Sequence, residues 1–373
     1  MDIYKDVKQG KGPQHDEISL VVTRSDYMLH EPTSTMLQVE LNTIASSFGC
    51  LATLVSSLHR YILGRYGVTQ EILDEKLPEN TSMTAIVDGL AAAVLEHGHE
   101  DKTMMMVVQP DEQNSFDQQW LQFKLWDRYG IRTIRRTLKD IDGRAVLDEE
   151  TGCLSIDGIT VSLAYFRAGY TPDDYTGEEE WNARKIVELS NTAKCPTIAM
   201  QLAGSKKVQQ DLASPGVVER FSRSEDDARI MRDCFAGLWG LDTLEDDMEA
   251  RQAVEDAINN PDMYVLKPQR EGGGNNLYGE DMAERLRSKE NLGSLVLMQR
   301  ILPPPHTVTM VRRGVPTEMS SLSELGIYGV LLRRGNVILR NTEAGQLVRT
   351  KASTSSEGGV AAGYAVLDSV QFI

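Results

Sequence analysis

Strand-like and helix-like segments alternate over residues 104–191, and this alternation is the strongest constraint on the fold. Segments typical of strands lie at 104–109, 131–137 and 161–166, and helix-like segments lie at 116–129 and 181–191. Consecutive strands joined through helices form a parallel sheet with crossover connections. We therefore expect an α/β unit over residues 101–200, inserted into a larger body.

Two polar segments follow strands of this unit, at 112–118 and 167–170. Ligands of parallel sheets bind beyond the carboxyl ends of the strands. Gln118 and Arg167 are therefore candidate ligand-binding residues. A solvent-facing helix position for Gln118 and a solvated strand end for Arg167 fit the chemistry of these side chains equally well, so both interpretations stay open.

A second constraint is the stretch 264–279. A short apolar run there leads to Lys267, and the glycines 272–274 follow. Glycines lack Cβ, so their N–H groups can close on an anion. Lys267 and Arg270 supply positive charge, and Glu271 supplies an oxygen suited to Mg²⁺. No Gly-Lys-Ser/Thr follows these glycines and no G-x-G-x-x-G opens a helix, which excludes the P-loop and Rossmann motifs. A flexible surface loop is the alternative, but this combination directly after a strand favours a phosphate site.

A strand is also expected at 36–41, just before a small-residue turn. Side chains alternate across a strand, so Glu40 and Asn42 lie on the same side of it. A carboxylate and an amide oxygen two residues apart make half of a Mg²⁺ site. An edge strand with polar side chains is the alternative interpretation.

The formal net charge of −16 argues against a nucleic acid or an anionic membrane as partner. Any anionic ligand must therefore meet a local group of basic residues. The candidates are Lys206, Lys207, Lys267, Arg270, Arg349 and Lys351.

The four cysteines are widely spaced, contain no C-x-x-C and are too few for a disulfide framework, so we expect reduced thiols. No apolar stretch approaches the roughly 18 to 20 residues of a transmembrane helix, and the first residues lack a signal-peptide pattern. We therefore expect a cytoplasmic protein that contacts no membrane.

Several motifs, which occur along the chain in the family's order, resemble those of the eukaryotic glutathione synthetases, a branch of the ATP-grasp ligases. Lys267 to Gly279 resembles the glycine-rich lid loop of that family. The other matching segments are Thr23–Met28, Glu40–Ile44, Gln201–Gln210, Ser323–Ile327, and Arg349–Lys351 through Gly358–Gly363. The resemblance runs from about Asp2 to the C-terminus.

The resemblance and the strand pattern together imply an α/β fold with an ATP-grasp-like body, an inserted parallel α/β substrate domain and a small glycine-rich lid. Antiparallel body strands are expected at 307–313, 325–332 and 337–340. The expected divisions are 1–100 for the first part of the body, 101–200 for the substrate-binding domain, 201–262 for body helices, 263–302 for the lid, and 303–373 for the last part of the body with a second glycine-rich loop.

The resemblance further implies an enzyme that joins γ-glutamylcysteine and glycine to glutathione through an acyl phosphate, with ATP and Mg²⁺. Metal ligands would be Glu40, Asn42 and Glu271. Nucleotide-binding residues would be Lys206, Lys267, Gly272, Gly273, Gly274, Asn276, Tyr278, Met298, Gln299, Arg300, Ile301, Glu324, Lys351 and Glu357. Residues that bind the dipeptide or glycine would be Arg24, Ser47, Glu112, Asn114, Gln118, Arg167, Tyr170, Arg349, Val360 and Ala361. Catalytic roles would fall to Arg349, Lys267 and Arg24.

Three features depart from the family pattern. Glu357 stands where animal members carry aspartate, and Ala45 replaces a small hydroxyl residue. Family members also carry a helix-rich segment before the part that matches Asp2, so we expect any homodimer to be weakened here. Two alternatives to the ligase remain: a relative that binds nucleotide or thiol peptide without turnover, and a ligase with another acceptor amino acid.

Overall fold

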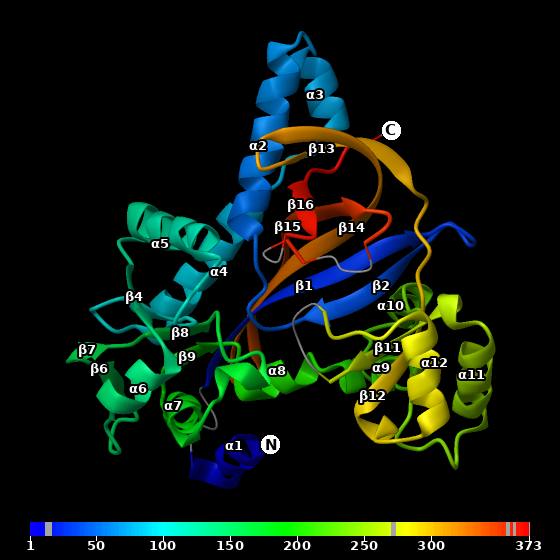
Figure 1. Ribbon diagram of the computed structural model, residues 1–373. Coiled ribbons are helices and arrows are strands. Elements are labelled where there is room, and N and C mark those ends of the chain that lie inside the picture. The colour runs from blue at the N-terminus through cyan, green and yellow to red at the C-terminus, as the bar shows by residue number, and fades with distance from the viewer. Residues whose placement is uncertain (12–16, 270–273, 356–358, 361–362, 373) are drawn as a thin grey trace.

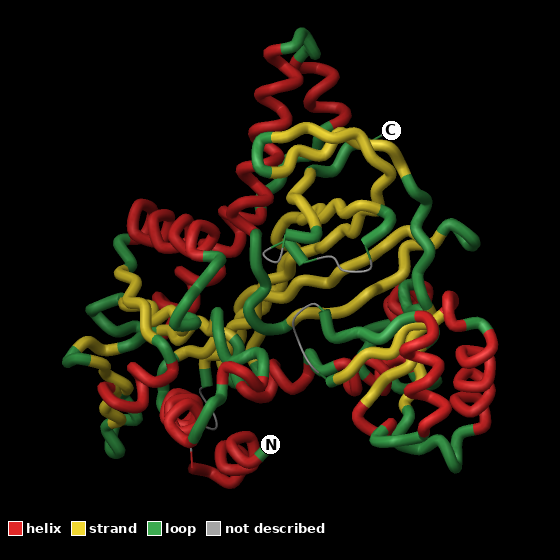
Figure 2. Tube along the Cα trace, viewed as in Figure 1, coloured by secondary structure: helices red, strands yellow, loops and turns green. Residues whose placement is uncertain are grey.

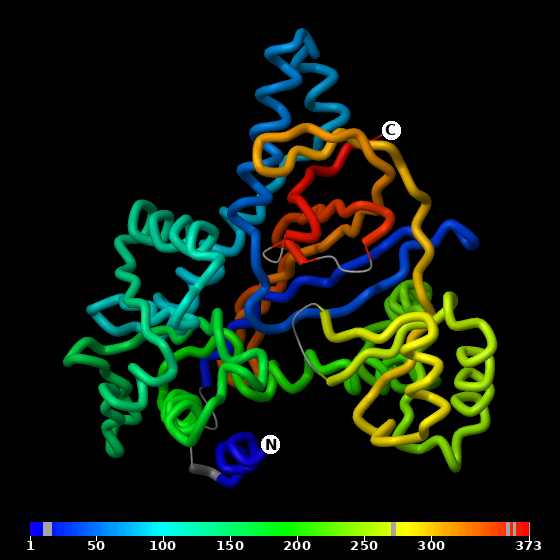
Figure 3. Tube along the Cα trace, viewed as in Figure 1, coloured from blue at the N-terminus to red at the C-terminus, as the bar shows by residue number. Residues whose placement is uncertain are grey.

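A large mixed sheet forms the centre of the computed structural model, which describes residues 1–11, 17–269, 274–355, 359–360 and 363–372 (Figure 1). Within these residues the sheet has ten strands, in the order β16-β15-β14-β1-β9-β8-β3-β4, with β13 paired to β14 and β2 paired to β1. Its antiparallel strands are β1 (Ile18–His30), β2 (Thr35–Asn42), β13 (His306–Arg312), β14 (Val315–Arg334), β15 (Val337–Ala352) and β16 (Ala365–Asp368). Figure 3 shows that these come from opposite ends of the chain, with blue strands beside orange and red ones.

The other four strands form the expected parallel α/β unit. They are β3 (Thr103–Val107), β4 (Arg132–Arg136), β8 (Leu163–Phe166) and β9 (Ala193–Cys195), and their pairings are parallel. Helices α5 (Ser115–Tyr129), α6 (Leu138–Arg144) and α7 (Glu178–Leu189) connect them, and a separate small sheet contains β5 (Ala145–Leu147), β6 (Leu154–Ile156) and β7 (Ile159–Thr160). The parallel strands continue the body sheet, because β9 pairs with β1 through Ser19 and Lys194.

The antiparallel and parallel strands share one hydrophobic core. Helix α4 (Ser82–His97) supplies Ile86, Leu90 and Val94 at helical spacing, and these pack with Leu20 of β1 and Met104 of β3. Helices α2 (Gly49–Arg65) and α3 (Gln70–Lys76) project from the body at the top of Figure 1. A single apolar core therefore holds the body and the inserted unit together.

A smaller α/β unit lies at the lower right of Figures 1 and 2 and contains the segment predicted as the lid. Its antiparallel sheet has the order β10-β12-β11, formed by Leu238–Gly240, Leu295–Gln299 and Tyr264–Pro268. Helices α11 (Met248–Asn259) and α12 (Gly279–Ser288) pack on this sheet around Leu266, Met282 and Leu297. We call β10, β11, β12, α11 and α12 the lid unit. It takes β10 and α11 from the segment 201–262, where we expected body helices.

The remaining helices connect these parts. They are α1 (Asp2–Asp6), the π-helix Val7–Lys11, α8 (Ile198–Ala203), α9 (Lys206–Ala213) and α10 (Glu225–Asp233), with short 3₁₀ turns at Pro172–Asp174, Val218–Arg220, Pro261–Met263 and Leu292–Ser294. Helices α8 and α9 run from the parallel strands toward the lid unit (Figure 1). In the part of the chain that the structure describes, we find no helix with the length and apolarity needed to span a membrane.

Candidate functional site

The register of β1 against its two neighbours gathers polar side chains on one face of the sheet. Arg24 lies opposite Asn42, and Asp26 lies opposite Glu40. On the other side of β1, Asp26 pairs with Gly326 of β14. Residues two apart on a strand share a face, and paired residues share it across strands. Arg24, Asp26, Glu40 and Asn42 therefore lie together, with a glycine where a side chain would crowd them.

The next strand pair adds another acid and another arginine. Glu324 of β14 lies opposite Arg349 of β15, and the two form an ion pair. The Nη2 atom of Arg349 also lies 3.1 Å from Oδ2 of Asp26. Burial raises the pKa of Glu324; Arg349 opposes this shift, Asp26 adds to it, and the pKa stays above its ordinary value. Two carboxylates thus share one guanidinium.

A cavity of about 500 Å³ opens between this sheet face and the lid unit. We call it the strand-face cavity. It brings together most residues predicted to bind ATP and metal, and both arginines predicted to be catalytic. Its walls include Arg24, Glu40, Asn42, Lys206, Lys267, Asn276, Tyr278, Met298, Gln299, Arg300, Ile301, Glu324, Arg349 and Lys351.

Some residues predicted to bind ATP, metal or substrate do not line the strand-face cavity, or fall outside the described residues. Glu271, Gly272, Gly273, Glu357 and Ala361 fall outside the described residues. Gly274 is described and has a φ of +86°, a left-handed conformation that favours glycine. Val360 packs against the body core, beside Gly359, which lines the cavity.

A β-bulge in β2 connects the cavity to the lid unit. Asp26 pairs with Glu40 while Tyr27 pairs with Gln38, so Val39 is the additional residue of the bulge. The carbonyl of Val39 accepts a hydrogen bond of 2.8 Å from Nζ of Lys267, which is almost fully buried. The bulge therefore provides a fixed acceptor for the lysine that precedes the glycine-rich loop.

Glu40 and Asn42 present oxygen atoms suited to a divalent cation. Burial alone would raise the pKa of Glu40, but Lys206 and Lys267, with the two arginines, bring it below its ordinary value. Its carboxylate is therefore ionised at neutral pH. Nδ2 of Asn42 donates to the carbonyl of Arg24 at 3.3 Å and to Asp26 at 3.0 Å, which leaves Oδ1 as the amide's acceptor. Within the described residues, no group of three His, Cys, Asp or Glu side chains is arranged to hold a metal ion.

The segment 298–301 forms an apolar wall of the cavity. Met298 and Ile301 pack with Leu37 and Val265. The N–H of Gln299 donates to the carbonyl of Gly237, and the N–H of Arg300 donates to the carbonyl of Met263. These two donors are thus already engaged, and a backbone hydrogen bond to a base would have to use other groups of the segment.

Polar residues at the carboxyl ends of the parallel strands form a second group, which we call the strand-end cluster. Nε2 of Gln118 donates to Glu112 at 2.6 Å, and the N–H of Asn114 donates to the same carboxylate at 2.7 Å. Gln118 has 0% exposure and Arg167 has 4%, which excludes the solvent-exposed alternatives for both. The cluster contains Ser47, Glu112, Asn114, Gln118, Arg135, Arg167 and Tyr170.

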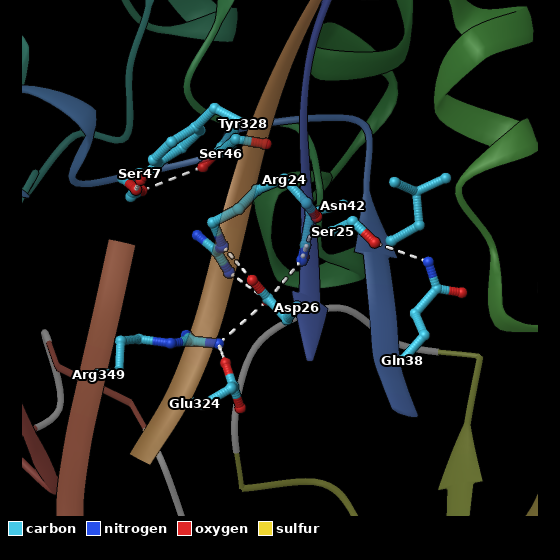
Figure 4. Close-up of polar contacts among 12 residues, drawn as sticks. Arg24, Ser25, Asp26, Gln38, Asn42, Ser46, Ser47, Glu324, Tyr328 and Arg349 are labelled. Atoms are coloured by element: carbon cyan, nitrogen blue, oxygen red, sulfur yellow. Dashed lines mark hydrogen bonds and ion pairs between the residues drawn. The ribbon is translucent and has the colours of Figure 1, made fainter. Parts of the chain in front are cut away.

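Ser47 belongs to this cluster, whereas Arg24 lines the strand-face cavity, although we expected both to face one pocket. Arg167 donates to Oγ of Ser47 at 2.5 Å and to the carbonyl of Ser46 at 3.0 Å. Buried Tyr328 pairs across the strands with Arg24, and its hydroxyl donates to the Ser47 carbonyl at 2.5 Å. Tyr328 therefore lies between the two groups, and Figure 4 shows it with Ser47 of the cluster and Arg24 of the cavity.

Sequence reasoning assigned no role to three buried or half-buried residues. Asp26 has 0% exposure and lies among Arg24, Asn42 and Arg349 (Figure 4). Arg135 of β4 donates to Oε1 of Gln118 at 2.7 Å, and burial lowers its pKa. Asp117 accepts from the N–H groups of Phe48, Cys50 and Leu51 and so holds the start of α2. The available signal was the spacing Arg24-x-Asp26, which places both charges on one strand face.

Taken together, the cavity offers lysines and arginines for a polyanion, and two oxygen donors for a hard cation. The strand-end cluster combines arginines with a carboxylate, which matches the opposite charges of an amino acid's ammonium and carboxylate. Tyr328 lies between them. The arrangement can hold a phosphate-rich ligand beside a small zwitterionic one.

The chain is similar in sequence to one family of known proteins. Residues 1–372 match the family model described as eukaryotic glutathione synthase, ATP binding domain. A chloroplastic glutathione synthetase from Solanum lycopersicum is 48% identical over 96% of this chain and 65% of its own length, and one from Arabidopsis thaliana is 45% identical over 96% and 66%. The glutathione synthetase of Homo sapiens is 40% identical over 98% of this chain and 77% of its own. This chain thus spans slightly less than two thirds of the length of the two plant proteins.

A solved structure has the same fold. The glutathione synthetase-like effector of Globodera pallida, in its apo form, superposes with a TM-score of 0.77 over 100% of this chain and 80% of its own, at 21% sequence identity.

Proposed function

Since the chain belongs to the eukaryotic glutathione synthase family, we propose that it is an ATP-dependent ligase that joins γ-glutamylcysteine to glycine. The observation that carries this proposal is the strand-face cavity, where the lysines of three separate family motifs meet two arginines and two oxygen donors. A carboxylate and an amine do not condense in water without activation. The first task of such a site is therefore to bring ATP and a carboxylate together despite their like charges.

The proposed reaction has two steps. An oxygen of the dipeptide's C-terminal carboxylate attacks the γ-phosphorus of ATP, and ADP leaves with the bridging oxygen. The amine of glycine then attacks the carbonyl carbon of the acyl phosphate. Inorganic phosphate leaves with the C–O electron pair, and the nitrogen loses a proton as the amide forms. The residues of the cavity have to bind, orient and neutralise these groups.

Positive charge in the cavity is divided between two tasks. Lys206, Lys267 and Lys351 would bind phosphate oxygens, and the position of Lys267, on β11 of the lid unit and anchored to the Val39 carbonyl of β2, fits this role. Arg24 and Arg349 would orient the reacting carboxylate and stabilise the negative charge that develops on it. Both guanidiniums stay charged, because acidic neighbours raise the pKa of each more than burial lowers it.

Glu40 and Asn42 would hold Mg²⁺ together with Glu271, which lies outside the described residues. The ionised carboxylate and the amide oxygen left free by Asp26 fit an oxygen-binding cation. When bound, Mg²⁺ would supply charge neutralisation at the phosphates.

The strand-end cluster would bind the amino-acid end of the dipeptide. Arg167 would meet its carboxylate and Glu112 its ammonium, while Gln118 and Tyr170 complete the pocket. Tyr328 and Ser47 would then face the middle of the substrate, between the cluster and the cavity. This orientation directs the cysteinyl carboxylate toward Arg24 and Arg349.

The deciding experiment is phosphate release from ATP with γ-glutamylcysteine, with and without glycine, together with chromatography of the products. We expect phosphate and glutathione in equal amounts when all three substrates are present. Rapid ATP hydrolysis without glutathione would contradict the proposal. A relative that only binds would instead show a melting temperature raised by ATP and no phosphate release.

Glycine is the proposed acceptor. The small side chains of the segment 360–363 resemble those of the family members that use glycine. Exclusion of one additional methylene is worth about 1–3 kcal/mol, so we expect glycine to exceed β-alanine by roughly 10- to 200-fold in kcat/KM. A higher kcat/KM with β-alanine or serine would identify a ligase with another acceptor.

We also propose a cytosolic location, on the sequence pattern, and a homodimer, on the family resemblance. Two plant relatives are named as chloroplastic, so imaging of the tagged full-length protein decides the compartment. Sedimentation at several protein concentrations decides the oligomeric state.

A further inference from the structure

We infer that Asp26 is a positioning residue for the reaction, and that its carboxylate sets the orientation of Arg24, Arg349 and Asn42 toward the ligands. The inference rests on the proposed function for the identity of those ligands. Asp26 has 0% exposure and lies behind the wall of the strand-face cavity, which its three partners line. It therefore acts through these side chains.

The contact with Arg24 determines which part of that guanidinium is available. Nε donates to Oδ1 of Asp26 at 2.7 Å, and Nη2 donates to Oδ2 at 2.8 Å. This bidentate pairing occupies one edge of the planar group in a fixed geometry. The remaining N–H donors are those of Nη1 and the second N–H of Nη2. Asp26 thus sets the direction in which Arg24 meets a ligand.

The same carboxylate constrains the second arginine. Nη2 of Arg349 contacts Oδ2 of Asp26 at 3.1 Å and also pairs with Glu324. These contacts hold one end of the guanidinium against the sheet, while Nη1 and Nε remain for other partners. Because Asp26 contacts both arginines, the spacing between the guanidinium groups of Arg24 and Arg349 depends on it.

Asp26 also fixes the direction of an amide. Nδ2 of Asn42 donates to Oδ2 of Asp26 at 3.0 Å and to the carbonyl of Arg24 at 3.3 Å. An amide whose nitrogen is held in this way directs its oxygen to the opposite side. A neutral amide in place of Asp26 could present its own N–H groups to Asn42. The Asn42 amide would then no longer be held with its nitrogen toward position 26.

The strands leave little room for Asp26 to move. A Cβ at Gly326 would lie 2.8 Å from Oδ1 of Asp26 and 2.9 Å from Cδ of Arg24. Any side chain at position 326 would therefore displace the pair. The glycine at the paired position is a second structural requirement of the same arrangement.

A buried ion pair elsewhere provides a matched control. Arg184 and Glu188 have side-chain exposures of 0% and 1%, and their contact is 2.9 Å. Beyond each other, they bond to main-chain groups of Pro196 and Ile198 and do not line the strand-face cavity. Asp26→Asn and Glu188→Gln each remove one buried, arginine-paired carboxylate, and such changes generally destabilise a protein.

The experiment compares wild type, Asp26→Asn and Glu188→Gln in melting temperature and in kcat and KM for each substrate. We expect both variants to melt at lower temperature. Misplacement of the reacting groups should lower kcat of Asp26→Asn roughly 10- to 100-fold. KM for ATP should not rise, because loss of the aspartate's negative charge makes the cavity more positive. Glu188→Gln should keep kcat within about twofold, since no positioned group is involved. Equal kcat losses in the two variants, or a wild-type kcat in Asp26→Asn, would overturn the inference.

Two further measurements keep the test decisive. Mn²⁺ binding in the presence of ATP, followed by electron paramagnetic resonance, should weaken in Asp26→Asn but not in Glu188→Gln. If wild type releases no phosphate, the proposed function fails, and the Mn²⁺ titration alone tests the positioning role of Asp26. Equal Mn²⁺ affinities in wild type and Asp26→Asn would then refute that role. If Asp26→Asn does not fold, Gly326→Ala takes its place, and a wild-type kcat and Mn²⁺ affinity in that variant would equally refute it.

Discussion

The strand-face cavity and the strand-end cluster differ in how the chain assembles them. In the cavity, Asp26 and Arg349 are 323 residues apart in sequence, and they meet because the three strands β1, β14 and β15 align in register. In the cluster, Glu112 and Gln118 are six residues apart and meet across the start of α5. Side chains bond to one another in both groups, and the cavity in addition leaves a space of about 500 Å³. The difference indicates that positions in the cavity depend on the whole sheet, whereas the contacts of Glu112 with Asn114 and Gln118 in the cluster depend on one loop and one helix.

The largest expected effect is in the cavity. Arg349→Met removes the cation that two carboxylates share, so it leaves Asp26 and Glu324 facing each other without that neutralising charge. It also removes a proposed donor to the reacting carboxylate. We expect kcat/KM for the dipeptide to fall roughly 100- to 1000-fold, measured as phosphate release. Arg340→Met changes a residue on the same strand that does not line the cavity, and it should remain within about twofold of wild type. Similar losses in both variants would contradict the proposed role of Arg349.

An intermediate effect is expected in the cluster. Glu112→Gln weakens charge-assisted hydrogen bonds to Gln118 and to a ligand's ammonium, and such bonds contribute about 1.5–3 kcal/mol. We expect KM for γ-glutamylcysteine to rise about 10- to 100-fold with KM for ATP unchanged. The exposed neighbour Gln113, changed to alanine, is the control. A matching rise in KM for ATP would mean that the two regions are not separate as described.

The smallest effect concerns pH. The pKa of Glu40 lies below its ordinary value of 4.5, so its ionised form is favoured by folding. Its contribution to stability is therefore present above about pH 4.5 and is lost as the pH falls through the lowered pKa. Glu40→Gln should melt a few degrees below wild type at pH 7, and the gap should close under acid conditions. A gap that widens as the pH falls would contradict the assigned direction.

Local patterns predicted most of the fold. The alternation of strands and helices over 101–200 gave the parallel unit, and the fold class is confirmed. Strands β14 and β15 are longer than the predicted 325–332 and 337–340, because their outer parts are polar and partly exposed and are held by pairing with β13 and β16. The short β5, β6 and β7 were not predicted, since runs of two or three residues leave no period to detect.

The site was predicted through the family resemblance more than through local chemistry, and the residue roles stay proposals. Period-two alternation placed Glu40 and Asn42 on one face of their strand. The sequence around Arg349 does not indicate that this residue lies on the same face of the sheet. Asp26 was missed because its partners come from three strands, and the register that joins them is a tertiary property. Arg135 was missed for a similar reason, since it meets Gln118 only after the sheet has formed.

The shared core of the body and the parallel unit has a consequence for how parts of the molecule open. Leu20, Leu90 and Met104 belong to one core, whereas Leu266 and Met282 of the lid unit belong to another. Segments with separate cores can unfold locally at separate free energies. Backbone amides of β1 and β3 should therefore exchange with deuterium as one slow group, and those of β11 and β12 as a second, faster one. The strand-face residues on β1 and the strand-end cluster would then keep their spacing while the lid unit unfolds locally.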